Sequence, residues 1–369
     1  MSDIPKAPQA AAAGRAGQYP SPVGSREHAE PRHADGGAAL EPAPWLPGGQ
    51  IAPGQPTLDD LEAMPPLESF LRTLSLTDTG ARTVEDIFTG PSQWMPNGRV
   101  FGGQVAAQSI VAAMRTVPED RPVHSMHGYF VRPGDIRSPI TFSVGRLHDG
   151  NSFSTRRVQA YQGGVPIWSM ISSFQEEQPG LDHAIPMPED MPDPDSLPSE
   201  ANIVAEAGES LANYWVHRRP FAMRHVEGPI YTTPSADRTP GQAIWVKAVG
   251  PMPDDPILHR AAIAYVSDYS ILEPVLRRHG LSWIDPRLRV ASLDHGVHWH
   301  RFARADEWLL YVQDSTTAVG GRGFVQGRFY TRDGRLVASV QQEGMVRLRE
   351  DAAGEPSASA PGPAVQRRA

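Results

Sequence analysis

The stretch VFGGQVAAQSIVAAMRTV (residues 100–117) joins a glycine pair, Gly102 and Gly103, to a run with a broad apolar face over residues 105–117. Apolar residues at this spacing predict a helix that begins beside the glycines. Four strand-like runs follow, separated by turn signals such as DGN and QGG. They are HSMHGYFVRPGD (124–135), ITFSVGRLHD (140–149), SFSTRRVQAYQ (152–162) and VPIWSMISSF (165–174). This part of the chain therefore predicts one helix followed by a sheet meander.

The same order of elements recurs further along the chain. LHRAAIAYVSDYSILEPVLRR (258–278) predicts a helix, and it is followed by VASLDHGVHWHR (290–301), EWLLYVQDSTTAV (307–319), GFVQGRFYTRDG (323–334) and RLVASVQQEGMVRL (335–348). Residues 162–174 and 332–344 also align as a turn and a strand, which indicates an internal duplication into two domains. A long helix on an antiparallel sheet that curls round it is the hotdog architecture. We therefore predict an α+β double hotdog whose two sheets join into one extended sheet, with both helices on the same side.

Composition divides the chain further. Residues 1–55 and 350–369 are rich in Ala, Pro and Gly without a sustained period, so we expect two disordered tails. Residues 177–210 begin with a stretch rich in proline and acidic residues and are expected to be a linker. The patterned regions then predict an N-terminal hotdog domain at 68–176 and a C-terminal one at 211–349.

Charge and cysteine content limit the possible partners and chemistry. The formal net charge of −8 leaves no basic stripe to neutralise phosphates, so we expect no nucleic-acid partner. No run approaches the ~18 apolar residues of a membrane span, and the N-terminal sequence lacks the apolar core of a signal peptide. The absence of cysteine excludes disulfides and thiolate chemistry and favours a cytoplasmic location.

Three long strings carry a likeness to a known family: residues 100–135, residues 148–175 and DEWLLYVQDSTTAVGGRGFVQGRFYTRDGRLVASVQQEG (306–344). They resemble the type II acyl-CoA thioesterase family, and the likeness spans roughly residues 68 to 349. The resemblance implies hydrolysis of acyl-CoA thioesters to free acid and CoA, with neither a metal nor a cofactor. It further implies an enzyme of fatty acid and lipid metabolism, with acyl-CoA as its partner, that forms a homo-oligomer.

The resemblance also implies the residues that hold the attacking water. Members of the family use an Asp on the second helix, a Thr or Ser and a Gln. The matching positions in this sequence are Asp268 in AYVSDYS, Ser292 in VASLDH and Gln342 in VQQEG.

Two of these residues are unusual by their pattern alone. Asp268 falls on the apolar stripe of the expected helix 258–278, where an unbonded carboxylate is costly and often has a raised pKa. A structural aspartate bonded to a backbone amide would fit the same pattern. Gln342 is the one polar residue on the strand face formed by Leu336, Ala338, Val340, Gln342, Gly344 and Val346, whereas Gln341 falls on the opposite face. A satisfied core glutamine is the alternative.

Ser292 does not follow the alternation of its strand. Strict alternation places it with Val290, Asp294 and His298, opposite an apolar face that contains Val297. The strand therefore has either a bulge or two partly buried faces, and the pattern leaves both possibilities open.

The segment LDHGVHWH (293–300) has the composition of a metal site, but strand alternation separates His295 from His298 and His300. Two ligands on one face do not make a site, so we expect these histidines to be structural or pocket-lining, with no metal.

The start of the first helix, at Gly103 and Gln104, offers backbone amides and a positive dipole end for substrate binding. A glycine pair would equally serve close helix–sheet packing. Arg132, Arg156 and Arg157 could meet CoA phosphates, although strand arginines more often face solvent.

Two other functions fit the same architecture. One is a catalytically silent double hotdog that binds acyl-CoA, and mutual geometry discriminates it, because an enzyme needs the Asp268, Ser292 and Gln342 side chains to converge. The other is a hydratase or dehydratase, which requires a His with an acidic partner near the thioester.

Overall fold

The computed structural model describes residues 55–82, 84–200 and 213–349, which belong to one compact unit. The expected tails, 1–55 and 350–369, lie outside these residues except for Gln55, whose side-chain amide donates to the backbone oxygen of Thr89 at 2.6 Å. The expected linker 177–210 is described as far as residue 200 and contains the short 3₁₀-helix η1 (Pro194–Ser196).

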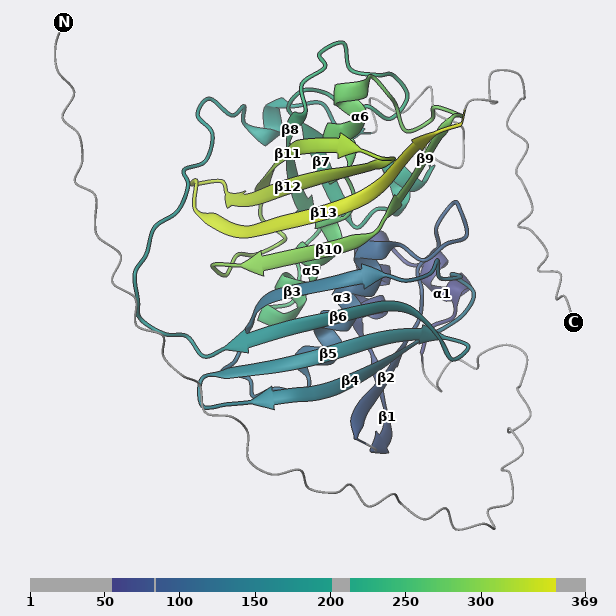
Figure 1. The fold of residues 1–369 in the computed structure, drawn as a ribbon, viewed down its shortest axis with the longest axis vertical. Coiled ribbons are helices and arrows are strands. Elements are labelled where there is room, and N and C mark those ends of the chain that lie inside the picture. Colours follow the sequence, from purple (N-terminus) through teal and green to yellow (C-terminus); the bar gives the residue numbers. More distant parts are fainter. Residues whose placement is uncertain (1–54, 83, 201–212, 350–369) are drawn as a thin grey trace, which may run out of the picture. The chain divides into compact units, whose positions relative to one another are not determined.

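The described strands form one 13-stranded antiparallel sheet (Figure 1). Its order is β1-β2-β4-β5-β6-β3-β10-β13-β12-β11-β8-β7, and β9 pairs with β13. The bounds of its strands are β1 (Thr77–Arg82), β2 (Glu85–Gly90), β3 (Val123–Phe130), β4 (Ile140–Asp149), β5 (Phe153–Gln162), β6 (Val165–Gln175), β7 (Phe221–His225), β8 (Gly241–Ala248), β9 (Leu288–Ser292), β10 (Asp294–Trp299), β11 (Leu309–Val319), β12 (Arg322–Thr331) and β13 (Leu336–Leu348).

The two parts of the sheet have the same topology. In each, the strand before the long helix (β2 or β8) lies on the outer side, the three-strand meander comes next, and the strand after the helix (β3 or β10) lies innermost. β3 and β10 pair with each other, with Val297 opposite Met126, and so join the two parts. The aligned segments 162–174 and 332–344 supply β6 and β13, which hold equivalent places. The predicted double hotdog with one joined sheet is confirmed.

The helices are short and few. α3 (Gly102–Met114) and α5 (Pro256–Ser267) lie on the same face of the sheet and contact each other (Figure 1). α5 starts at Pro256 after Asp255, whose carboxylate caps the amide of Ile257 at 2.8 Å. One buried apolar cluster contains residues of both helices, so the two parts share a core. The other described helices are α1 (Leu58–Ala63), α2 (Pro66–Leu74), the π-helix η3 (Tyr214–Arg218) and α6 (Glu273–His279).

The expected helix over 258–278 is wrong in its middle. α5 ends at Ser267, and α6 starts only at Glu273. Pro274 explains the break, because it has no amide proton for the carbonyl of Ser270 and its ring would clash with that carbonyl in a continuous helix. The freed oxygen of Ser270 accepts instead from the Glu273 amide at 2.9 Å.

Most of the predicted strands are confirmed, but the run expected at 290–301 forms two strands, β9 and β10, divided at Leu293. Several elements had no prediction. These are the strands before each long helix (β1, β2, β7 and β8) and the helices α1 and α2. β2, with the sequence EDIFTG, buries only two residues, so its alternating pattern is short. A strand this short has too few alternating positions for a pattern to stand out.

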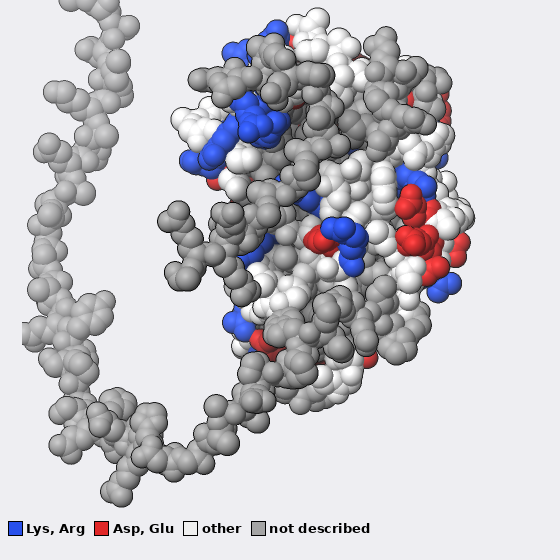
Figure 2. Space-filling view, turned by 90° about the vertical axis from the view of Figure 1, so that its right-hand side faces the viewer, with Lys and Arg blue, Asp and Glu red and all other residues white. Residues whose placement is uncertain are grey.

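Charges of both signs share the surface. Figure 2 shows Lys and Arg side chains in separate groups, with Asp and Glu beside them, on the face turned to the viewer. Within the described ranges, no helix is long and apolar enough to cross a membrane.

The contact between α3 and α5 yields the first prediction. A Cβ atom on Gly103 would lie 2.3 Å from the backbone oxygen of Tyr265, and backbone cannot give way as a side chain can. We expect Gly103→Ala to lower the free energy of unfolding by about 1–3 kcal/mol, measured by denaturant titration. Gly180→Ala is the control, because no atom lies within 4 Å of its added Cβ. Equal effects of the two substitutions would contradict the close helix contact.

Candidate functional site

Asp268 sits at the C-cap of α5, directly after Ser267, rather than within a continuous helix. Its Oδ2 accepts a hydrogen bond from the backbone amide of Gly103 at 2.9 Å. That amide belongs to the first turn of α3, where free N–H groups and the helix dipole favour a negative charge. The carboxylate is therefore held by an amide from the other half of the chain.

The glycines beside this contact give the carboxylate room. A Cβ on Gly102 would lie 2.6 Å from Oδ2 of Asp268 and 2.8 Å from the ring of Phe130. Any side chain at position 102 would therefore displace either the carboxylate or the aromatic ring. The glycine pair serves both helix packing and access to Asp268.

Ser292 reaches the same carboxylate because of a bulge. In the pairing with β13, Ser292 stands opposite Gly344 and Gly296 opposite Gln341, so four steps along one strand match three along the other. One extra residue shifts the alternation. Ser292 and His295 therefore share the inward face, and the bulge alternative is correct. The Ser292 hydroxyl donates to Oδ1 of Asp268 at 3.1 Å.

Asp294 stabilises the bulge. Its Oδ1 accepts from the backbone amide of Glu343 at 2.6 Å, and its Oδ2 meets Nε2 of His127 at 2.9 Å. The carboxylate thus supplies a partner to an amide that the disrupted ladder would otherwise leave without one.

Gln342 completes the group of three. As the alternation predicts, it is fully buried on the inward face of β13, and Gln341 lies on the opposite face. Its Nε2 donates to Oγ of Ser292 at 2.8 Å, and its Oε1 meets Nδ1 of His295 at 2.5 Å. The structure thus brings Asp268, Ser292 and Gln342 into one hydrogen-bonded chain.

The three histidines of residues 293–300 separate as expected. His298 and His300 are exposed, whereas His295 is fully buried and contacts Gln342. Across the described chain, no three His, Asp or Glu side chains are grouped as a metal site requires. The contact of His295 with the candidate site was missed, because its position depends on the bulge and alternation alone cannot locate it.

Burial shifts the pKa values of Asp268 and His295. It raises the pKa of Asp268, and His295, Gln342, Ser292 and the Gly103 amide act in the opposite direction. Burial also lowers the pKa of His295, against the attraction of the Asp268 charge. A carboxylate with a raised pKa is a better base for a water proton than an ordinary surface aspartate.

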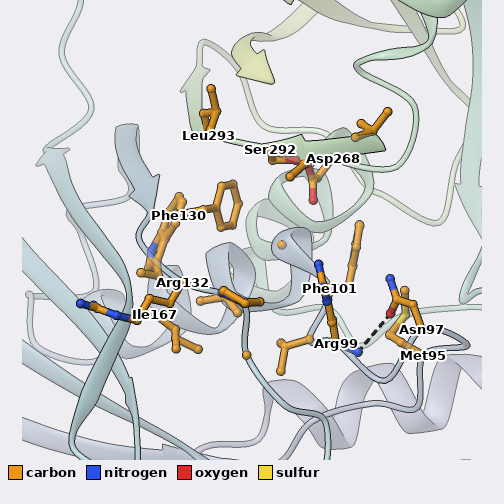
Figure 3. Close-up of a pocket in the computed structure, with 18 of the residues that line it drawn as sticks. Met95, Asn97, Arg99, Phe101, Phe130, Arg132, Ile167, Asp268, Ser292 and Leu293 are labelled. Atoms are coloured by element: carbon orange, nitrogen blue, oxygen red, sulfur yellow. Dashed lines mark hydrogen bonds between the residues drawn. The ribbon is translucent and has the colours of Figure 1, made fainter. Parts of the chain in front are cut away.

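A cavity of about 440 Å³ opens beside these residues, and Asp268, Ser292 and Gln342 form part of its wall. Most of the other lining side chains are apolar or aromatic: Met95, Val100, Phe101, Val105, Phe130, Ile167, Trp168, Tyr269, Leu272, Trp283 and Val290. Figure 3 shows Asp268 beside Ser292, with Phe130 and Arg132 to one side and Phe101 and Arg99 to the other. The exposed arginines Arg99 and Arg132 line the same cavity.

Gln104, Arg156 and Arg157 lie apart from the cavity. The side chain of Gln104 is fully buried and accepts from the amide of Gln93 at 3.0 Å, so it does not line the cavity. Arg156 is also buried, contrary to the expectation of a strand arginine facing solvent, and it pairs with Asp149 at 2.7 Å. Arg157 is exposed and pairs with Glu85. Of the three arginines considered, only Arg132 lines the cavity.

Comparison with known families gives two matches along the chain. A family described as acyl-CoA thioesterase matches residues 222–345, and one described as acyl-CoA thioesterase N-terminal domain matches residues 91–175. The first match contains α5 and most of the strands from β7 to β13, and the second contains α3 and the strands β3 to β6.

Individual proteins are similar over the same region. Acyl-coenzyme A thioesterase 8 of Homo sapiens is 37% identical, covering 72% of this chain and 86% of that protein. Acyl-CoA thioesterase 2 of Haemophilus influenzae is 35% identical, covering 72% and 93%. The crystal structure of acyl-CoA thioesterase II TesB2 from Mycobacterium marinum is 36% identical with a TM-score of 0.61, covering 78% of this chain and all of that one.

The raised pKa of Asp268 can be measured directly. We expect its carboxyl carbon to titrate above the ordinary value of about 3.9 in ¹³C NMR, and Asp285, whose pKa is lowered by its hydrogen bond with Arg287, to titrate below it. The folded chain then holds the Asp268 proton more tightly than the unfolded chain. The stability from this group is therefore present below the unfolded pKa and lost as pH rises through the folded pKa. Equal titration midpoints for Asp268 and Asp285 would contradict the opposite pKa shifts.

Proposed function

The chain belongs to the acyl-CoA thioesterase family and hydrolyses acyl-CoA thioesters to free acid and CoA, and we propose that Asp268, Ser292 and Gln342 position the attacking water. The observation that carries this proposal is the hydrogen-bonded chain of these three side chains at the wall of one cavity. They come from three separate elements, the C-cap of α5, β9 and β13.

The roles follow from hydrogen-bonding capacity. Asp268 accepts a proton from water as the water oxygen attacks the thioester carbonyl carbon. Nε2 of Gln342 has two hydrogens. One is donated to Ser292, and the other, which lies near the Asp268 carboxylate, can orient a water or carbonyl held there. The tetrahedral intermediate then collapses, the carbon–sulfur bond breaks, and the CoA thiolate takes up the proton. Thioesters are activated acyl donors, so this route requires no covalent enzyme intermediate.

Ser292 orients the base in this scheme. Its hydroxyl donates to Asp268 and accepts from Gln342, so both hydrogen-bonding directions are already used. No G-x-S-x-G elbow surrounds it, which also argues against a serine nucleophile.

The N-terminus of α3 contributes an electrostatic term. Gly103 donates to Asp268, so the positive end of the helix dipole faces the proposed base. A thioester carbonyl attacked by a water held at Asp268 would develop its negative oxygen near the same helix end. For Gln104 we propose an indirect contribution. Its amide holds Pro91 and Gln93, which lead into the cavity-lining residues Met95 and Asn97.

The lining of the cavity offers two kinds of contact, apolar and cationic. The aromatic and aliphatic side chains around Phe101, Leu272 and Trp283 suit an acyl chain. The exposed arginines Arg99 and Arg132 suit the phosphates of CoA, because guanidinium groups bind phosphate in a bidentate manner.

Several broader features belong to the same proposal. We propose hotdog domains at 68–176 and 211–349, and a homo-oligomeric cytoplasmic enzyme of fatty acid and lipid metabolism. The exposed apolar side chains Tyr129 and Ile171, neighbours on paired strands, support association through the outer sheet face. The cysteine-free sequence supports a reducing compartment.

Replacement of the base tests the mechanism. Asp268→Asn keeps the side-chain shape but removes the charge, so we expect kcat to fall by about 10²–10⁴ with substrate affinity retained. Free-thiol release at saturating acyl-CoA measures the effect. A variant with unchanged kcat would exclude Asp268 as the base. A wild-type protein that binds acyl-CoA without turnover would instead support the silent double hotdog.

Two neighbouring glutamines form a matched control for this test. Gln342→Ala should lower kcat because the water loses its orienting amide, whereas Gln341→Ala, on the opposite strand face, should leave kcat unchanged. Ser292→Thr keeps the hydroxyl and should be tolerated where Ser292→Ala is not. Equal kcat values for the two glutamine variants would contradict the assignment.

The arginines at the cavity give a separate prediction. Arg99→Ala and Arg132→Ala should each raise KM for acyl-CoA about 10-fold, with little change in kcat, because each removes a charged hydrogen bond worth roughly 1.5 kcal/mol. On a thioester that lacks the nucleotide part of CoA, the same variants should have the KM of the wild type. An unchanged KM on acyl-CoA would place the phosphates elsewhere.

A further inference from the structure

His295 is fully buried behind Gln342, yet the water-positioning scheme gives it no task. Its two ring nitrogens are both engaged. Nδ1 meets Oε1 of Gln342 at 2.5 Å, and Nε2 meets Oγ of Ser267 at 2.8 Å. A buried imidazole with two specific partners restricts which proton positions its neighbours can adopt.

The proton positions follow from Asp268 outward. An ionised carboxylate only accepts, so the Ser292 hydroxyl must point its hydrogen at Asp268. Oγ of Ser292 then offers lone pairs to Gln342 and requires the NH₂ end of the amide there. The carbonyl end, Oε1, is left facing His295, and an oxygen acceptor at that distance requires a hydrogen on Nδ1.

The far side of the ring is compatible with this assignment. Ser267 Oγ lies 2.8 Å from Nε2 and 2.9 Å from the backbone oxygen of Ala264, so its single hydrogen can serve either acceptor. With a neutral ring that carries its proton on Nδ1, the Ser267 hydroxyl donates to Nε2. Every side-chain hydrogen bond from Ser267 through His295, Gln342 and Ser292 then points toward Asp268.

We propose that His295 is a positioning residue that donates from Nδ1 to Oε1 of Gln342 and so fixes the amide with its NH₂ end toward Ser292 and the cavity. The proposal rests on the proposed function, because the amide orientation matters for the rate only if Gln342 orients the reacting water or carbonyl. A flipped amide would either place two acceptors, Oε1 and Oγ, against each other or turn the Ser292 hydroxyl away from Asp268 to donate to Oε1. His295 thus acts through Gln342 and does not touch the substrate.

Substitutions of His295 can separate the effect of its hydrogen-bond donor from the effect of its shape. Asn and Leu have the same branched arrangement of four side-chain heavy atoms, but the amide nitrogen of Asn can stand near the Nδ1 position and donate, whereas Leu cannot. We expect His295→Leu to lower kcat about 10- to 100-fold with KM unchanged, the range typical of partners that orient functional side chains. His295→Asn should recover most of that loss. Equal kcat values for the two variants, or wild-type kcat in His295→Leu, would overturn the proposal.

His298 provides the control on the same strand. It is exposed and points to the opposite face, so His298→Leu should leave both kcat and KM as in the wild type. Thermal melts of all three variants report folding. A kcat loss in His298→Leu equal to that in His295→Leu would also overturn the proposal, since it would show a general effect of removing an imidazole from β10.

A measurement on the unaltered protein stands even where His295→Leu fails to fold. Two-bond ¹H–¹⁵N NMR correlations of labelled histidine identify which ring nitrogen carries the proton. We expect a proton on Nδ1 of His295. A neutral ring with a bare Nδ1 and a proton on Nε2 would overturn the proposal, because that nitrogen could not donate to Gln342.

The proposed mechanism and the role of His295 can be refuted separately. Full activity of Asp268→Asn would refute the proposed mechanism whatever His295 does. An inactive Asp268→Asn together with a fully active His295→Leu would leave the mechanism standing and refute only the role of His295.

Discussion

The amide of Gly103 reaches the carboxylate of Asp268 because two helices from different halves of the chain touch at their ends. That contact sets several requirements on the sequence. Positions 102 and 103 have no space for a Cβ, and α5 must end before Asp268 so that the carboxylate can turn toward α3. In return, the helix N-terminus offsets part of the cost of burying a charge.

A second constraint comes from the sheet. The extra residue between Ser292 and Gly296 changes which side chains face inward, and it puts a hydroxyl and an imidazole on one face three positions apart. A regular strand would send one of them to the outer face. The bulge therefore assembles the polar group beneath the cavity, and Asp294 supplies the hydrogen bond that the irregular ladder needs.

Elements with strong periodicity could be predicted from the sequence. Features whose position depends on contacts between distant parts of the chain could not. The strands of both meanders and the face occupied by Gln342 follow from alternation alone. The roles of Asp268 and Ser292 came from the family resemblance, since neither residue has a decisive local pattern. The break at Pro274 was predictable from the missing amide proton, but apolar spacing on both sides concealed it. The contact of His295 with Gln342 required the bulge, whose position depends on pairing between distant strands.

The two halves share a topology but differ in chemistry at equivalent places. α5 is followed by Asp268, whereas α3 is followed by Arg115, whose guanidinium donates to the backbone oxygen of Leu76 at 2.6 Å. A symmetric dimer of a single unit would have to place the same residue at both positions. When two units are joined in one chain, the two positions can differ. The end of α5 can then carry the Asp268 carboxylate, while the end of α3 carries Arg115, which binds the backbone of Leu76. Under the proposed mechanism, the protein has one reaction centre for every two hotdog units.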